Sequence, residues 1–248
     1  MRIFKDFKEA LQWCRGLLKD SGYVVENQFW QSIETNRPTI EVLNTSFLVP
    51  LDNPIKWDDD IKPNKPWVER HLEERLSGIP YNPPPSHEIW PFAINKNKIH
   101  GGGDKFSHTY PERYWPKTLN GGMSGIRYDY GDCGDLIELL GGDPNTRQAY
   151  LPVFFPEDTG SVSNQRIPCT LGYHFIQRNG YFHIIYYMRS CDYMRHIRDD
   201  IWLTLKLGQW ILNKLVGPYP EGWEDVKLGT FTMHITSLHI FKEDLKFI

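Results

Sequence analysis

The stretch "IPCTLGYHFIQRNGYFHIIYYMRSCD", residues 167 to 192, decides the fold that we expect of this chain. It contains two runs rich in aromatic and β-branched residues that meet at Asn179-Gly180, and an Asn-Gly pair between such runs is a strong β-hairpin signal. Cys169 follows a proline at the head of the first run. Most free cysteines are buried and inert. The segment therefore raises the question of whether Cys169 is a buried small side chain or an accessible nucleophile.

Hydrophobic spacing predicts the remaining elements. Apolar residues at helical intervals predict helices over residues 4–19, 67–77, 133–144 and 199–216. Apolar and β-branched runs predict strands over residues 39–50, 148–155 and 231–241, whereas proline-rich segments predict loops over 52–66 and 79–92. Because strands and helices do not alternate regularly, the order indicates an α+β fold.

Composition limits the class of protein. The 248 residues, 40% of them hydrophobic and 14% aromatic, can bury a large core, and we expect a single domain over residues 1–248. A net charge of −3 gives no electrostatic footprint for nucleic acid or an anionic membrane. Without a signal peptide or an apolar run of membrane-spanning length, the expected location is the cytoplasm, or the host cytoplasm if the chain is phage-encoded.

Cysteine and histidine spacing argues against disulfides and metals. The four cysteines include no CxxC pair, so reduced thiols are expected. The nine histidines include no HExxH pair, so no metal site is predicted. Glycine clusters at 101–106 and 119–125 lack the strand–glycine–helix order of a phosphate loop and are predicted to be surface loops.

Residues suited to an anion accompany Cys169. The second run ends in "MRSCD", which supplies Arg189, Ser190 and Asp192, and "DPNTRQ" places Arg147 just before the strand expected over 148–155. Planar guanidinium donors together with a hydroxyl suit a phosphate group. The alternative is that these arginines pair with some of the 31 acidic residues at the surface.

Taken together, these segments resemble the thymidylate synthase family. The 167–192 stretch is similar to the nucleophile segment of that family, in which Pro-Cys, a strand and a hairpin lead to Arg-Ser-x-Asp. "DPNTRQ" is similar to its Asp-Ser-Arg-Arg loop and "SLHIF" to its late His-x-Tyr strand. The resemblance covers residues 130 to 241 and implies a thymidylate synthase-like fold, with a mixed β-sheet packed against helices and a homodimer formed through the sheet.

The resemblance also implies the chemistry. The Cys169 thiolate would add to C6 of a pyrimidine nucleoside monophosphate, so that C5 can take a one-carbon unit from the co-substrate 5,10-methylenetetrahydrofolate. A nearby guanidinium favours the thiolate form of a cysteine. Matched position by position, Arg147, Arg189 and Ser190 would bind the phosphate, and Arg147 would come from the partner subunit. Asp192 matches the aspartate near the folate, and His239 the histidine at the sugar hydroxyl.

Asp200 occupies the family position that reads the base, eleven residues after Arg189. Cytosine accepts at N3 and donates from its 4-amino group. An aspartate meets that pattern either protonated or ionised against an N3-protonated ring. Phage-type deoxycytidylate (dCMP) hydroxymethylases carry this aspartate, and the "RDD" sequence here resembles theirs. The alternative is that Asp199 or Asp200 merely caps the following helix.

Several positions depart from the family pattern. In "HLEERLSG", His71 stands where a catalytic glutamate is expected, and a histidine can also relay protons. A shifted register could instead bring in Glu69 or Glu73. Gln148 replaces the second phosphate arginine, Phe241 replaces a sugar-binding tyrosine, and "LNGG" at 119–122 replaces the usual Tyr-Gly.

The predicted function is accordingly an enzyme, a pyrimidine C5 one-carbon transferase most like a dCMP hydroxymethylase of nucleotide biosynthesis and DNA modification. Water, rather than hydride, would complete its reaction. One alternative is methylation of dCMP or dUMP. Another is a nucleotide-binding homologue that has lost catalysis.

Overall fold

The structure is a computed structural model that describes residues 1–26, 29–30, 33–34, 37–91, 105–115, 118–119, 122–123, 131–158, 167–219 and 221–248. The predicted glycine loops at 101–106 and 119–125 lie largely outside these residues. The helices are α1 (Phe7–Ser21), α2 (Trp57–Ile61), α3 (Trp67–Arg75), α4 (Tyr110–Tyr114), α5 (Cys133–Gly142) and α6 (Ile197–Leu215). The strands are β1 (Arg2–Ile3), β2 (Tyr23–Val25), β3 (Phe29–Trp30), β4 (Ile33–Glu34), β5 (Thr39–Pro50), β6 (Thr118–Leu119), β7 (Gly122–Met123), β8 (Tyr150–Pro152), β9 (Thr170–Arg178), β10 (Tyr181–Asp192) and β11 (Lys227–Phe241).

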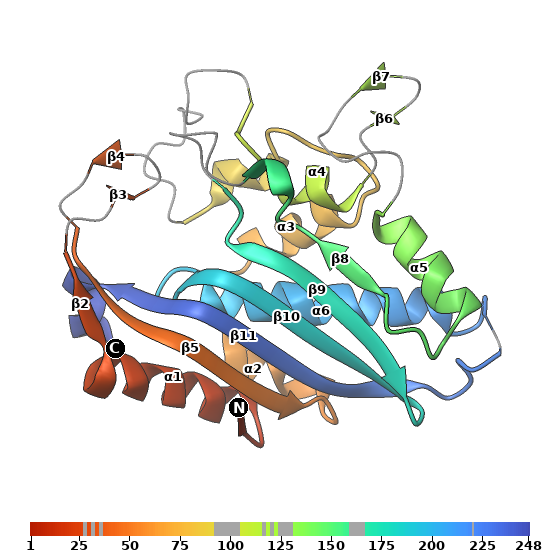
Figure 1. The fold of residues 1–248 in the computed structure, drawn as a ribbon, viewed down its shortest axis with the longest axis horizontal. Helices are drawn as coiled ribbons and strands as arrows, with labels where there is room; N and C mark the ends of the chain where they lie inside the picture. The colour runs from red at the N-terminus through yellow and green to blue at the C-terminus, as the bar shows by residue number, and fades with distance from the viewer. Residues whose placement is uncertain are drawn as a thin grey trace.

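The described strands form one seven-stranded mixed sheet in the order β1-β5-β11-β10-β9-β8, with β2 also paired to β5. The β1–β5 and β10–β11 pairs are parallel, and the other pairs are antiparallel. Helix α6 joins the parallel neighbours β10 and β11 in a strand–helix–strand crossover (Figure 1). Two further short pairs, β3–β4 and β6–β7, lie apart from this sheet.

The β9–β10 hairpin forms as the sequence predicts. Asn179 and Gly180 both have positive φ, at 54° and 76°. A two-residue turn with positive φ at both positions matches the twist of its flanking strands, and Asn-Gly adopts that conformation at low cost. Because this turn fixes the register, Arg178 pairs with Tyr181 and Thr170 pairs with Met188 near the far end. The hairpin therefore holds the two ends of the 167–192 segment together.

Helices α1 and α6 cover the same face of the sheet. Phe7 of α1 packs edge-on against Phe231, and Gly208 of α6 lies so close to Ile184 that a Cβ there would clash with its side chain. Ile184 and Phe231 are register partners on neighbouring strands, so they point to the same side. This face holds the continuous hydrophobic core.

The opposite face of the sheet is more open. Alternate residues of β10, namely His183, Ile185 and Tyr187, are half-buried, and the Tyr187 ring stacks on His234 of β11 with 5.1 Å between centroids. In Figure 1, α6 runs behind the strands and no helix lies in front of the centre of the sheet. Within the described residues, no helix has the length and apolar character to cross a membrane.

Two predicted loops contain short helices. The loop expected over 52–66 contains α2, where Trp57 and Ile61 are one turn apart and both buried. Three aspartates follow Trp57, where negative charge favours a helix N-terminus. The loop expected over 79–92 contains a 3-10 helix, Pro85–Ile89. Proline and aspartate content made both segments look irregular, but burial of a few side chains against the core favours a helical turn.

Candidate active site

Cys169 is exposed at the entrance to β9, directly beside the end of β10. The Arg189 guanidinium donates from Nε to the Pro168 carbonyl at 2.7 Å and from Nη2 to the Ile167 carbonyl at 3.0 Å. The same Nη2 lies 3.9 Å from the Cys169 sulfur. Arg189 thus supports the loop that presents the thiol and places a positive charge next to its sulfur.

The other cysteines differ sharply from Cys169. Cys14, Cys133 and Cys191 are buried, whereas Cys169 is exposed. Burial raises the pKa of Cys14 to about 12 and raises that of Cys191 well above its ordinary value. Buried thiols of this kind are poor nucleophiles. Of the four thiols, only Cys169 has the accessibility that the predicted role requires.

A chain of hydroxyl groups starts at the residue after Cys169. The Thr170 hydroxyl lies 2.8 Å from the Tyr110 hydroxyl and 2.8 Å from the Tyr186 hydroxyl. Burial, with Asp200 nearby, raises the pKa of both tyrosines. Tyr110 was not predicted from the sequence, although the start of α4 carries a signal. Thr109 and Glu112 form a capping box, and the Thr-x-x-Glu pattern is visible in the sequence.

Asp200 lies in the first turn of α6 but does not cap it. The N-cap residue is His196, which has no side-chain capping bond. Buried Asp199 accepts hydrogen bonds from the backbone N–H and the side-chain amide of Asn64, both at 2.7 Å. Asp200 is half-buried, and burial raises its pKa to about 7, against the opposing charge of Arg75. The capping alternative is therefore wrong for both aspartates.

His71 lies on the buried face of α3 and is bonded to a glutamate. Its Nδ1 atom contacts Glu74 Oε1 and lies 3.0 Å from the Ser86 hydroxyl. Burial and the Arg75 charge lower the pKa of His71 to about 4, so the ring is neutral near neutral pH. Glu74 is a carboxylate that can only accept, so Nδ1 carries the proton and Nε2 keeps its lone pair.

Glu74 is the carboxylate that the sequence analysis missed. Burial opposes its ionisation, but bonds from His71 and Ser86 outweigh this and hold the pKa of Glu74 below its ordinary value. Ser86 donates to it from the backbone at 2.8 Å and from the hydroxyl at 2.6 Å. Glu69 and Glu73, the two proposed for a shifted register, are exposed instead. Glu74 lies three residues after His71, and that helical spacing is the signal that could have identified it.

Ser190, Asp192 and His239 come together along the β10–β11 pair, where Asp192 and His239 are register partners. The Ser190 hydroxyl lies 3.5 Å from His239 Nδ1. Asp192 is only 6% exposed, and its carboxylate accepts from the backbone N–H groups of Met194 and Arg195 and from the Arg195 guanidinium at 2.9, 3.1 and 2.9 Å. The carboxylate of Asp192 is therefore engaged within its own turn.

Arg147 does not join this group within one chain. It is exposed in the turn before β8, where its carbonyl accepts a hydrogen bond from His174 at 3.0 Å. His174 is five residues from Cys169 along β9, which corresponds to about 16 Å of extended strand. Gln148 beside it is also exposed.

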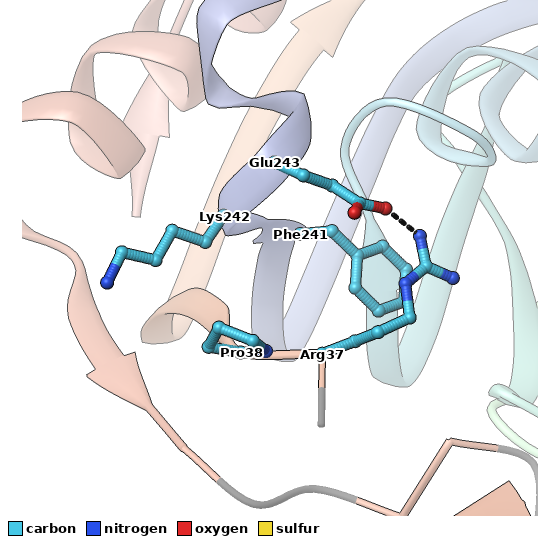
Figure 2. Close-up of a pocket in the computed structure, with 5 residues that line it drawn as sticks. All are labelled: Arg37, Pro38, Phe241, Lys242 and Glu243. Carbon is cyan, nitrogen blue, oxygen red and sulfur yellow. Dashed lines mark hydrogen bonds and ion pairs between the residues drawn. The ribbon is translucent and has the colours of Figure 1, made fainter. Parts of the chain in front are cut away.

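Phe241 lines a pocket of about 220 Å³ together with Arg37, Pro38, Lys242 and Glu243, and its ring meets His239 edge-on with 6.3 Å between centroids. Figure 2 shows the Arg37 guanidinium extended over the Phe241 ring, 4.0 Å from its centroid, and paired with Glu243. A second guanidinium, that of Arg195, lies 4.4 Å from the same centroid. The Phe241 ring is thus covered by two cations. Across the described residues, no group of three or more His, Cys, Asp or Glu side chains could hold a metal ion.

Comparison with known proteins finds similarity in structure but no match to a family model or a curated protein. Among solved structures, it is similar to thermostable thymidylate synthase A from Bacillus subtilis, with a TM-score of 0.67 and 16% sequence identity. The alignment covers 100% of this chain and 83% of that one. The α+β expectation is confirmed, and the chain has a thymidylate synthase-like fold in which a mixed sheet packs against helices.

Proposed function

We propose that this chain is a pyrimidine nucleotide C5 one-carbon transferase whose substrate is dCMP and whose product is the 5-hydroxymethyl nucleotide. The observation that carries the proposal is the exposed Cys169 thiol with the Arg189 guanidinium 3.9 Å from its sulfur. This pair lies in a fold shared with a thymidylate synthase. The local sequence of that pair, Pro-Cys followed by a hairpin and Arg-Ser-x-Asp, points to the same chemistry.

Cys169 would act as the nucleophile. Its thiolate adds to C6 of the pyrimidine, a sulfur–carbon bond forms, and the C5–C6 π pair moves to C5. C5 then bonds to the incoming one-carbon unit, the C5 proton is lost, and the bond between that carbon and the donor nitrogen breaks, so that tetrahydrofolate would leave. Water adds its oxygen to the one-carbon unit and gives up a proton, while the sulfur–C6 bond breaks to restore the ring. The adjacent Arg189 charge favours thiolate over thiol. In the same proposal, Arg189 and Ser190 bind the phosphate and His239 the sugar hydroxyl.

Asp200 would bind the cytosine edge. Its pKa of about 7 means that it exchanges a proton near neutral pH. When protonated it donates to N3 and accepts from the 4-amino group, and when ionised it accepts from both positions of an N3-protonated ring. An aspartate therefore suits cytosine in either state.

His71 would relay protons at the base. It is neutral, and the Glu74 and Ser86 contacts hold its ring with Nδ1 as donor and Nε2 as acceptor. A neutral imidazole with a fixed tautomer can take a proton at Nε2 and return it. In this proposal Glu74 orients His71 and does not replace it.

The family's one-carbon donor, methylenetetrahydrofolate, is the proposed co-substrate. When bound, it would supply a one-carbon unit at the oxidation level of formaldehyde. Asp192 is the residue carried over for it, but that carboxylate is buried and bonded to Arg195. To bind a folate, the Asp192 carboxylate would have to release the Arg195 guanidinium and bond to the ligand instead. None of the proton transfers or bond-making steps proposed above uses Asp192.

The proposed assembly is a homodimer formed through the open sheet face. Arg147 is exposed and lies about five residues of strand away from Cys169, too far to share a phosphate with Arg189 in one chain. In a symmetric dimer, an isologous interface lets each subunit supply a residue to the other. The half-buried His183, Ile185 and Tyr187 would lie in that interface.

Mass spectrometry of the nucleotide tests the proposal. The protein is incubated with dCMP, dUMP or CMP, each with and without methylenetetrahydrofolate. Gain of a hydroxymethyl group on dCMP supports the proposal, and gain of a methyl group on dCMP or dUMP supports the methyltransferase alternative. No change with any nucleotide, while dCMP still binds, supports an inactive homologue. Cys169→Ser should abolish the gain, whereas Cys14→Ala, which removes a buried thiol, should not.

A further inference from the structure

Arg75, the last residue of α3, is a buried cation whose guanidinium has no hydrogen-bonding partner among the residues that the structure describes. It is 4% exposed, and its guanidinium lies 3.8 Å from the Tyr110 ring centroid and 6.0 Å from that of Tyr114. Its Nε atom is sealed from solvent and has no partner. Within the described residues, the guanidinium forms no hydrogen bond or ion pair, so its contacts are with aromatic faces.

Arg113 shows how this chain pairs a buried arginine that has a structural role. It is 1% exposed, donates to Asp158 through two nitrogens at 2.6 and 2.9 Å, and reaches the Val153 carbonyl at 2.9 Å. An arginine sealed away from water without such partners is costly, because its lost hydration is not replaced. The contrast lies in the terminal nitrogens of the two guanidinium groups, which donate to Asp158 and Val153 in Arg113 and to none of the described groups in Arg75. It indicates that the partner of Arg75 is something other than the described protein groups.

The charge of Asp200 raises the pKa of Arg75. Burial opposes the charge of Arg75, but the tyrosines around it and Asp200 hold its pKa above its ordinary value. Even so, no ion pair joins Arg75 to Asp200 among the described residues, and no side-chain hydrogen bond of Asp200 is formed there either. The two opposite charges are thus close enough to act on each other but are not bonded to each other among the described residues, which suits a ligand that bonds to both.

The aromatic contact links Arg75 to the nucleophile. Its guanidinium lies on the Tyr110 ring, and the Tyr110 hydroxyl is bonded to Thr170, the neighbour of Cys169. Asp200 also raises the pKa of Tyr110 after burial, so it lies close to the same ring. Arg75 is therefore linked through Tyr110 to the neighbour of Cys169, and the charge of Asp200 acts on both Arg75 and Tyr110.

We infer that Arg75 is a specificity-determining residue that donates a hydrogen bond to the O2 carbonyl oxygen of the pyrimidine, beside the Asp200 contact. This inference rests on the proposed function. O2, N3 and the 4-amino group occupy consecutive positions on one edge of cytosine. Asp200 satisfies N3 and the amino group, and O2 remains as the acceptor for a buried donor.

A donor at O2 also fits the reaction. When sulfur adds to C6 of a cytosine whose N3 accepts from protonated Asp200, the electron pair that moves to C5 is delocalised through C4 and N3 onto O2. A cation already fixed at O2 stabilises that charge without reorganisation, which is how preorganised donors lower a barrier. In uracil the proton on N3 interrupts this path, so an O2 cation favours cytosine.

Equilibrium binding of dCMP and its 2-thio analogue tests the inference. Sulfur in place of O2 is a weak acceptor, so the analogue removes the proposed bond while keeping the ring. For wild type, we expect the analogue to bind about tenfold or more weakly, as for a hydrogen bond to a charged group. Arg75→Met should bind dCMP about 10- to 100-fold more weakly and should no longer discriminate between the two ligands. The matched control is Arg70→Met, on the exposed side of the same helix, which should behave as wild type.

The outcomes are separable. If Arg75→Met weakens both ligands by the same factor, Arg75 has a structural role and the inference is overturned. If the wild-type protein binds no pyrimidine nucleotide, the proposed function is wrong, and the inference about Arg75 is wrong as well. Thermal melting and circular dichroism check folding, and Arg75→Lys, which keeps the charge, serves if the methionine variant does not fold. The lysine variant should lose affinity for dCMP severalfold and discriminate less, and wild-type values for both quantities would overturn the inference.

Discussion

The backbone N–H of Arg189 donates to the carbonyl oxygen of Cys169 across 2.9 Å, although the two residues are 20 positions apart in the chain. The hairpin turn at Asn179-Gly180 makes this contact possible. The Arg189 side chain then wraps back onto the carbonyls of Ile167 and Pro168. One local turn therefore determines both the exposure of the thiol and the charge beside it.

Alkylation should be confined to Cys169. In the folded protein, iodoacetamide should modify one cysteine, because Cys14, Cys133 and Cys191 are buried. Peptide mapping identifies the modified residue, and unfolding in guanidinium should expose all four. Arg189→Met should slow modification, because it removes the positive charge next to the sulfur. Rapid labelling of a second cysteine under native conditions would show that Cys14, Cys133 or Cys191 is accessible to solvent and contradict its burial in the core.

Titration of Asp200 should lower the free energy of unfolding as the pH rises toward and through 7. Its folded pKa of about 7 lies above the ordinary value of an unfolded aspartate, so between these values the folded state binds more protons. The free energy of unfolding contributed by this group is thus fully present at acidic pH and is lost as the pH rises toward and through 7. Asp200→Asn should remove that slope.

Denaturant titrations of wild type and Asp200→Asn between pH 4 and 8 measure the difference. Comparing the two proteins cancels the contribution of His71, whose lowered pKa of about 4 acts in the opposite direction over an overlapping range. The expected result is a variant whose relative stability increases with pH. A difference that does not change with pH would mean that Asp200 titrates as an ordinary surface carboxyl group.

Glu74→Ala should destabilise the fold by about 3 kcal/mol, because it removes the acceptor of the buried His71 and Ser86 donors. The matched control is Glu73→Ala, one position away and exposed, for which a change within about 0.5 kcal/mol is expected. Chemical denaturation measures both variants. Equal effects would contradict the assignment of Glu74 as the partner of His71.

Arg147 should act on the active site of its partner subunit. Cys169→Ser and Arg147→Ala should each be inactive alone or nearly so. When the two variants are mixed and allowed to exchange subunits, a mixed dimer contains one site with both native residues. Activity should then return to about a quarter of the wild-type value for random pairing. Recovery would fail if Arg147 served its own chain or if the protein were a monomer, and sedimentation measurements distinguish these two cases.

Local signals predicted most of the fold and only part of the candidate site. The strand expected over 39–50 is β5, Thr39–Pro50, because β-branched residues over a closing proline are a local pattern. Helix α4 was missed because its five residues contain no apolar repeat, and its capping box is a short signal that is easily overlooked. Glu74 was missed because Glu69 and Glu73 were considered as alternatives to His71, although Glu74, three residues after His71, is the glutamate on its face of the helix.

By itself, the sequence determined the β9–β10 hairpin and thereby the nearness of Arg189 to Cys169, because turn conformation and strand alternation depend on neighbours in the chain. Only the tertiary structure decided that Glu74 bonds to His71, that Asp200 is half-buried rather than a helix cap, and that the Arg75 guanidinium is buried with no partner among the described residues. Burial and electrostatic environment are produced by segments far apart in the chain. They appear only once α3, α4, α6 and the sheet have packed together.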